Sequence, residues 1–247
     1  MNVVQKFIAI AIVLYFWGCS ASVNETVKEK EVVKSSEVKS EIEFRNPETE
    51  ERLHIKENQI KSIDKLEFQF DADGNTGSPL KLATLTYDEN GFLSETINYN
   101  SDGSEENLFA YEYDSSGTRL SSKRYDLQNR LQKIFLYEYD KRGLKVRVNR
   151  TNVSGQIEKY YKYEYDKTGK LLKESWFNSD GSKEFEIEYS YNSSGQKIEA
   201  NSFSFIGGDD YRYQLRYDVK GNLVEEIKQD DNGEKISVIQ YIYKYYD

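Results

Sequence analysis

The chain has 247 residues, a formal net charge of −9 and a hydrophobic fraction of 37%, which lies below the usual level for a globular protein. Acidic and basic residues alternate, and no run of Lys or Arg is long enough to follow a phosphate backbone, so we expect no nucleic-acid partner. The 21 Tyr and 12 Phe carry much of the apolar surface, which favours a thin aromatic sheet over a thick core.

The chain begins with a pattern that is typical of export. An apolar run at residues 7–17 follows Lys6; it is too short to span a bilayer but has the length of the central region of a secretory signal. Cys19, the only cysteine, comes directly after this run and Gly18, so it has no partner for a disulfide within the chain. The pair Gly18-Cys19 resembles the end of a bacterial lipoprotein signal peptide, in which the cysteine is diacylated and becomes the first mature residue.

This resemblance implies that residues 1–18 are a lipoprotein signal peptide and that lipidation at Cys19 anchors the protein to a membrane of the bacterial cell envelope. We expect the outer membrane, with the protein on its periplasmic or its exposed side. Ordinary signal cleavage after Ala21 is the alternative, and it would remove the cysteine and release the chain.

The next segment is rich in charge and poor in aromatic residues. From residue 22 to about residue 57, Glu and Lys alternate with scattered Val, and Phe44 is the only aromatic residue. Such a composition buries too little surface to offset its ordering entropy, so residues 19–57 are predicted to be a charged flexible tether. A short helix that uses the valines between residues 27 and 38 is the alternative.

Residues 58–247 are predicted to form a repeat domain. Tyrosines recur every 26 residues without an insertion or deletion, at Tyr87, Tyr113, Tyr139, Tyr165, Tyr191, Tyr217 and Tyr243. A glycine follows each of the first six tyrosines by four positions, and a second series of glycines stands 12 residues after the first, with Asn129 in place of one glycine.

These glycines mark turns. Asparagine is the non-glycine residue that best tolerates a positive φ, so Asn129 indicates a backbone requirement for the left-handed region rather than a gap left for a ligand. Most of these positions have Asp or Asn three residues earlier, which is typical of three-residue hairpin loops. The predicted structural turn residues are Gly91, Gly103, Gly117, Asn129, Gly143, Gly155, Gly169, Gly181, Gly195, Gly221 and Gly233.

Aromatic and charged residues alternate between the turns, as in Phe109, Tyr111 and Tyr113 with Glu112 between them. This alternation predicts strands with one aromatic and one solvated face. The fold class is therefore all-β: an antiparallel meander of about twelve strands from 26-residue tandem hairpin repeats. We expect a twisted or curled open sheet or a superhelical ribbon, whose free edges would allow an oligomer.

The turn units YDENGFL, YDSSGTRL, YDKTGKLL and YDVKGNLV resemble the tyrosine-aspartate (YD) repeats of Rhs-type bacterial surface and toxin proteins. The resemblance runs from about residue 70 to the end of the chain. It implies β-hairpins in a spiralling ribbon that encloses cargo or presents a recognition surface, and it implies a link to carbohydrate binding, as in some members of that family.

No arrangement of residues indicates catalysis, a cofactor or a metal. His54 is the only histidine and lies in the predicted tether or its junction with the repeats, and the abundant carboxylates recur with the turns. Asp71, Asp73 and Asn75 have the spacing of a calcium loop, but Leu82 stands where that loop needs its final glutamate. We therefore expect a non-enzymatic protein.

Two functions remain open for the aromatic face. Repeated tyrosines on a sheet usually pack against one another, but an exposed row of rings also suits a polysaccharide or a protein partner. The candidate ligand-binding residues are the aromatic residues that depart from the repeat pattern: Trp176, Phe177, Phe203 and Phe205. The leading hypothesis is a lipid-anchored envelope protein that binds such a partner, and the alternative is a structural spacer or assembly protein.

Overall fold

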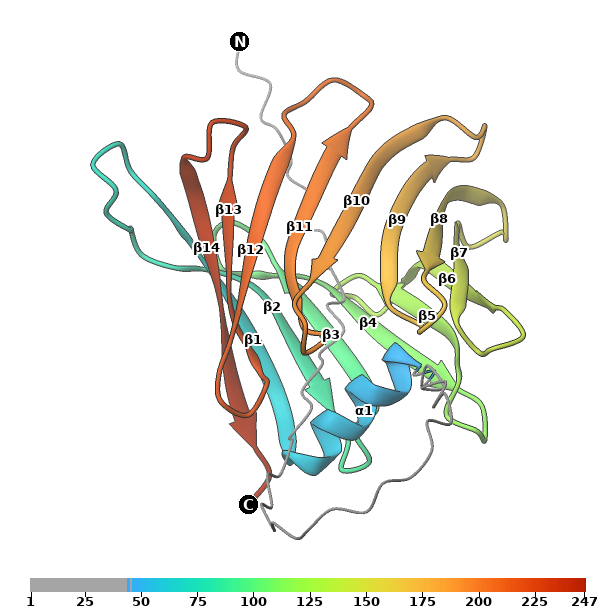
Figure 1. Cartoon of the computed structure of the whole chain (residues 1–247). Helices are drawn as coiled ribbons and strands as arrows, with labels where there is room; N and C mark the ends of the chain where they lie inside the picture. Colours follow the sequence, from blue (N-terminus) through green and yellow to red (C-terminus); the bar gives the residue numbers. More distant parts are fainter. Residues whose placement is uncertain (1–43, 45) are drawn as a thin grey trace, which may run out of the picture.

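The computed structural model describes residue 44 and residues 46–247, which form one helix and 14 strands (Figure 1). In chain order the elements are α1 (Pro47–Glu57), β1 (Ile60–Gln69), β2 (Leu80–Tyr87), β3 (Leu93–Tyr99), β4 (Glu105–Tyr113), β5 (Arg119–Tyr125), β6 (Leu131–Tyr139), β7 (Lys145–Thr151), β8 (Ile157–Tyr165), β9 (Leu171–Asn178), β10 (Lys183–Tyr191), β11 (Lys197–Ser204), β12 (Tyr211–Tyr217), β13 (Leu223–Gln229) and β14 (Lys235–Tyr245).

The strands form a closed barrel in which each strand pairs with its neighbours in the chain and β1 pairs with β14. The prediction of an all-β antiparallel meander is confirmed, but the open sheet of about twelve strands is wrong. The closing strand β1 precedes the first repeat, and it pairs through Ile63 with Leu85 of β2 on one side and with Tyr243 of β14 on the other.

Closure satisfies the backbone donors and acceptors that an open edge would expose. The described barrel therefore lacks the free edges on which the expected edge-to-edge oligomer depends.

Helix α1 occupies the end of the segment that was expected to be a flexible tether. Asn46 caps it by accepting hydrogen bonds from the backbone N–H groups of Glu48 and Thr49, Pro47 stands at its start, and acidic residues lie in its first turn. Ile55 is fully buried and fixes the inner side of the helix to the barrel. The predicted signal peptide, Cys19 and the rest of the predicted tether lie outside the described residues.

The predicted turn residues all have positive φ, from 57° at Asn129 to 94° at Gly169. The turns divide between the two ends of the barrel. At the helix end, α1 lies across the turns (Figure 1), and Asn46 donates to the Gly143 carbonyl while Arg52 lies within 3.4 Å of the Asn90 carbonyl. At the far end, a Cβ atom placed on Gly103 or Gly155 would meet nothing within 4 Å.

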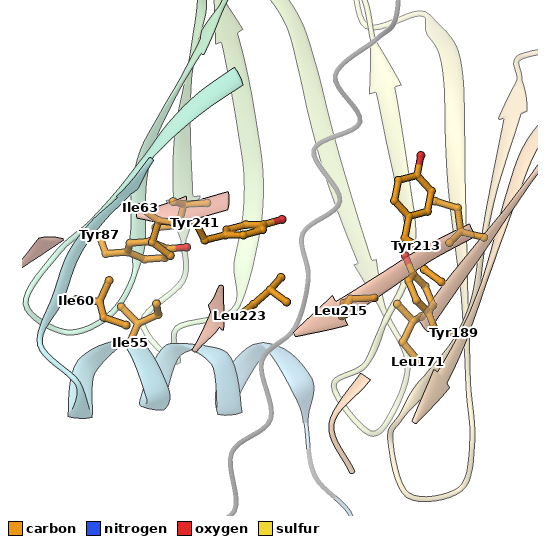
Figure 2. Close-up of a cluster of buried hydrophobic side chains, with 13 residues drawn as sticks. Ile55, Ile60, Ile63, Tyr87, Leu171, Tyr189, Tyr213, Leu215, Leu223 and Tyr241 are labelled. Carbon is orange, nitrogen blue, oxygen red and sulfur yellow. The ribbon is translucent and has the colours of Figure 1, made fainter. Parts of the chain in front are cut away.

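The strand register separates inner from outer residues, because directly paired residues of an antiparallel sheet share a face. Ile63 points into the barrel (Figure 2), and the pairing carries the inner face from strand to strand through Ile63, Leu85, Thr96, Phe109, Arg124 and Lys133. A second inner row runs through Tyr111, Ser122, Phe135, Arg150 and Lys159.

The buried apolar core lies on the inner face near the helix end. Figure 2 shows Ile55 of α1 pointing towards Ile60 and Tyr87, with Tyr189 and Tyr213 on another part of the wall. Since Ile55 and Ile60 are 0% and 1% exposed, the helix and the barrel wall share one core.

The outer face carries charge along its strands. Its ion pairs join neighbouring strands: Asp64 with Lys81 at 2.9 Å and with Lys244 at 2.8 Å, Lys173 with Glu186 at 2.8 Å, Arg212 Nε with Glu199 at 2.8 Å and Arg216 with Glu225 at 3.3 Å. Between residues 46 and 247, the structure contains no helix that is both long and apolar enough to cross a membrane.

Candidate functional site

The repeated tyrosines form two belts on the inner wall, and their hydroxyl groups are largely engaged by the barrel itself. In the belt nearest the helix end, four phenols donate to the backbone carbonyl 20 residues earlier: Tyr113 to Leu93 at 3.0 Å, Tyr139 to Arg119 at 2.8 Å, Tyr191 to Leu171 at 2.7 Å and Tyr243 to Leu223 at 2.8 Å. These contacts support a packing role for this belt.

The second belt bonds to side chains 15 residues earlier. The Tyr111 hydroxyl lies 2.9 Å from Thr96 Oγ1, and the Tyr137 hydroxyl lies 3.0 Å from Ser122 Oγ. The Tyr241 hydroxyl donates to Glu226. The belts thus join neighbouring hairpins, through a repeat position that carries Thr, Ser or Glu in these three bonds.

Between the belts and α1, the barrel encloses ionisable groups. Arg119, Lys145 and Lys197 occupy the same repeat position on three strands and are 9%, 4% and 1% exposed. Lys145 pairs with Glu48 of α1 at 3.2 Å, and the Lys197 ammonium lies 3.7 Å from the centre of the Tyr189 ring. Burial raises the free-energy cost of the charged form, which shifts the pKa of the buried group itself.

The pKa shifts in this cluster follow desolvation. Burial raises the pKa of Glu51 to about 7, although the positive charge of Arg119 opposes the shift. Burial likewise raises the pKa values of Glu174 and Glu226, and it lowers the pKa of Lys197 to about 8. The cluster therefore contains groups that change protonation near neutral pH.

A cavity of about 150 Å³ lies between α1 and the adjoining ends of the strands. We name it the helix-end cavity; its lining includes Glu48, Glu51, Tyr87, Tyr113, Arg119 and Tyr139. A second cavity, of about 510 Å³, shares Arg52, Phe92 and Tyr113 with it and reaches the exposed turn residues Asp88 and Asp114.

In the half of the barrel towards the far end, four cations lie on the inner faces of four consecutive strands. We name them the basic wall: Arg124 of β5, Lys133 of β6, Arg150 of β7 and Lys159 of β8.

Two carboxylates contact the basic wall. Glu158 lies 2.5 Å from Lys133 and 3.5 Å from Arg150, and Glu184 pairs with Lys159. Each of these three cations keeps 21–22% of its side chain exposed although it points inward, so water reaches this wall.

Aromatic rings adjoin the basic wall. We name these residues the aromatic row: Phe109, Phe135, Tyr161, Trp176 and Phe185. The rings of Phe109 and Phe135 are 5.6 Å apart, and Trp176 packs edge-on against Tyr161 at 5.3 Å and Phe185 at 5.7 Å. One inner wall therefore presents apolar rings beside positive charge.

The structure places one of the four predicted ligand-binding residues apart from the others. Trp176 points inward, is 8% exposed and donates its indole N–H to Glu174 at 2.7 Å. Phe177 points outward and stacks on Tyr160 at 4.9 Å, Phe203 pairs with Glu186 on the outer face, and Phe205 is 55% exposed. The Lys183 ammonium lies 5.8 Å from the Phe177 ring centre and 5.1 Å from the Phe205 ring centre, so these two residues adjoin on the outside of the barrel while Trp176 lies inside it.

His54 lies on α1, where its Nε2 is 2.9 Å from the Asn222 side-chain oxygen. Asp71 is the first residue of the segment whose spacing resembles a calcium loop. Its side chain accepts hydrogen bonds from the backbone N–H groups of Asp73 and Asn75, as expected for a turn. Within residues 46–247, no three His, Cys, Asp or Glu side chains are placed to hold a metal ion.

The sequence analysis did not identify the basic wall. A signal was present, because Arg124 and Arg150 are separated by one 26-residue repeat, as are Lys133 and Lys159. The latter two occupy positions that alternate with aromatic residues, as in Lys133, Phe135 and Tyr137, so the aromatic-face pattern placed them on the same side.

No family model matches the chain, and neither does any curated protein. Among solved structures, the chain is similar to a porin-like protein from Bacteroides uniformis, with 11% identity, a TM-score of 0.42, and coverage of 75% of this chain and 98% of that one. The Photorhabdus luminescens Tc holotoxin pore is 13% identical with a TM-score of 0.31, over 69% of this chain and 12% of that chain.

A Parabacteroides distasonis protein, provisionally described as a lipoprotein, is 8% identical with a TM-score of 0.28, over 75% and 96% of the two chains. Similarities at these scores carry no argument about function, and the resemblance to YD repeats stays a prediction.

Proposed function

We propose that the protein is a lipid-anchored, non-enzymatic binding protein of the bacterial cell envelope, and that its barrel holds the acidic end of a glycan at the basic wall. The observation that carries this proposal is the pairing of the aromatic row with the basic wall on one inner surface. Aromatic faces offer apolar contact to sugar rings, and Arg and Lys bind carboxylates through charge-assisted hydrogen bonds.

The charge balance of the wall favours an anionic ligand. Four cations face two carboxylates, Glu158 and Glu184, while Trp176 holds a third carboxyl group, Glu174, beside them. This surface therefore keeps an excess of positive charge within a chain whose net charge is −9. A wall that served only to neutralise two carboxylates would need fewer cations. The excess attracts anions and disfavours cationic partners.

The outer face supports an aqueous location for the barrel. Ion pairs such as Arg212 with Glu199 and Lys173 with Glu186 lie on strand surfaces that a lipid-embedded barrel would turn towards acyl chains. A single Lys or Arg at the middle of a bilayer costs a barrel about 2–4 kcal/mol. A barrel in water, held near a membrane by lipid on Cys19, avoids this cost.

A structural spacer is the second candidate, and the tyrosine belts favour it. Phenol-to-carbonyl bonds such as Tyr191 to Leu171 show that the repeated tyrosines already serve the barrel. In this alternative, the cations of the basic wall only offset the charges of Glu158 and Glu184, and the barrel binds no ligand there.

Matched charge removals on the two faces of the same strands distinguish the candidates. Arg124→Gln with Arg150→Gln removes two inward charges from β5 and β7 and leaves Lys133 to pair with Glu158. Lys123→Gln with Arg147→Gln removes two outward charges from the same strands. The probes are oligogalacturonates of two to six sugars, with uncharged maltooligosaccharides for comparison.

The proposal expects galacturonate binding that weakens about tenfold or more in the inward pair, because hydrogen bonds to charged groups contribute about 1.5–3 kcal/mol each. The outward pair should bind as the unmodified chain does, and maltooligosaccharides should bind more weakly to all three. No acidic-glycan binding, or equal loss in both pairs, would reject the basic wall as the site and favour the spacer.

A further inference from the structure

The helix-end cavity contains an arginine whose hydrogen-bonding capacity the described chain does not use in full. Arg119 lines the cavity and is 9% exposed, and its buried Nε has no hydrogen-bond partner within the described chain. Its guanidinium lies 5.0–5.6 Å from the ring centres of Tyr111, Tyr113 and Tyr137. Aromatic faces stabilise the charge but accept an N–H group only weakly, so Nε remains a buried donor for a ligand.

Glu51 brings a carboxyl group to the same cavity from α1. Its side chain is partly buried, and the helix holds it there because Ile55, one turn further on, packs into the barrel core. The neighbouring Glu48 is already engaged by Lys145 at 3.2 Å and by the Tyr139 hydroxyl at 3.1 Å. Arg119 and Glu51 are thus the two groups of the cavity that are best placed to receive a ligand.

We propose that the helix-end cavity binds a small monocarboxylate, with its carboxylate paired to Arg119 and accepting a hydrogen bond from the protonated carboxyl group of Glu51. The volume of about 150 Å³ corresponds to roughly five water molecules, since one water takes up about 30 Å³ in the liquid. This is room for a molecule of a few heavy atoms. The adjoining larger cavity, which reaches the exposed turns beside Phe92, supplies the entry path.

The charges around Glu51 select a monoanion. The second charge of a phosphate dianion would lie near the Glu48 carboxylate, so a dianion gains less from Arg119 than a monocarboxylate does. The charged and titratable groups that act on Glu51 come from α1 and seven strands, β1, β2, β4, β5, β7, β11 and β14. They are Glu48, Lys65, Tyr87, Tyr113, Arg119, Lys145, Lys197 and Tyr243.

Binding of a carboxylate should therefore depend on pH. With the pKa of Glu51 at about 7, the donor form rises from roughly one tenth of the molecules at pH 8 to roughly nine tenths at pH 6. Acetate, which stays ionised over this range, should bind about tenfold more tightly at pH 6 than at pH 8. Arg119 keeps its charge throughout this range.

Titration calorimetry of the full chain with acetate at pH 6, 7 and 8 tests this inference. Glu51→Gln keeps a hydrogen-bond donor at every pH, so its affinity for acetate should be the same at pH 6 and pH 8. Glu57→Gln, on an exposed position of the same helix, should keep the tenfold pH dependence. Arg119→Gln should abolish binding, and Glu51→Gln keeps the test decisive when the Arg119 variant does not fold.

Three results would overturn the inference: no heat of binding with acetate at pH 6, an unchanged pH dependence in Glu51→Gln, or inorganic phosphate or neutral acetamide binding as tightly as acetate. The site is independent of the basic wall, which lies on the far side of the tyrosine belts. A chain that does not bind acidic glycans can therefore still bind acetate, and a chain that does not bind acetate can still bind acidic glycans.

Discussion

The docking of α1 can be tested at two glycines that share a backbone conformation but differ in their surroundings. Gly91 has a φ of 81° and Gly155 a φ of 82°. A Cβ atom on Gly155 would meet nothing within 4 Å, whereas on Gly91 it would overlap the Arg52 carbonyl oxygen and lie 3.1 Å from the Lys56 nitrogen. The pair Gly91→Ala and Gly155→Ala therefore separates backbone strain from loss of helix docking.

The expected magnitudes follow from these contacts. The left-handed conformation costs a non-glycine residue about 1–2 kcal/mol, partly offset by about 0.4–1 kcal/mol from the stiffer unfolded chain, so Gly155→Ala should lower the free energy of unfolding by about 1 kcal/mol. In Gly91→Ala the backbone at Arg52 and Lys56 must move, which displaces Ile55, now 0% exposed. Exposing such a side chain costs about 1.5–3 kcal/mol more.

Urea unfolding followed by tyrosine fluorescence measures both variants. Gly91→Ala should be less stable than Gly155→Ala by about 2 kcal/mol, and hydrogen exchange should rise in α1 for Gly91→Ala alone. In a chain that already carries Ile55→Ala, the two glycine substitutions should cost nearly the same, because the burial of Ile55 has been removed beforehand. Equal destabilisation by the two substitutions in the unmodified chain would refute the account of helix docking.

Two further outcomes are expected. The folded pKa of Glu51, about 7, exceeds its ordinary value of 4.5, so its contribution to stability is fully present below pH 4.5 and is lost as the pH rises through 7. Over that window the unfolding free energy of the unmodified chain should fall relative to that of Glu51→Gln by up to about 3 kcal/mol. A constant difference between the two chains would contradict the burial of this carboxyl group. Replacing Cys19 with Ala should move the protein from the membrane fraction to the soluble fraction and remove its acyl mass, whereas continued membrane association without acyl mass would exclude the lipid anchor.

The sequence contains a signal for the start of α1, although the segment was predicted to be a flexible tether. Asn46-Pro47 followed by Glu48 and Glu50 is a helix-start signal with a capping residue, Pro at the first position and acids in the first turn. The surrounding Glu and Lys residues resemble those of a disordered segment, and the two buried residues of the helix, Pro47 and Ile55, are too few to form a periodic stripe. The helix depends on the barrel core for its stability, and only the tertiary structure shows that core.

The sequence by itself determined the hairpins, because turn geometry and strand alternation are local. Asn129 in a glycine series is enough to show that the backbone needs positive φ, and the alternation around Glu112 is enough to divide each strand into two faces. The same hairpins also build an open ribbon. Whether the sheet closes depends on the twist accumulated over all strands and on β1 meeting β14, which no single repeat encodes.

Which residues share a site depends on how distant elements come together. Alternation already puts Trp176 and Phe177 on opposite faces of β9, but only barrel closure makes one of those faces an interior. Arg119 and Glu51 lie on different elements, and α1 brings them to one cavity. Local rules determined the strands and their turns, and closure of the barrel over α1 determined where ligands can bind.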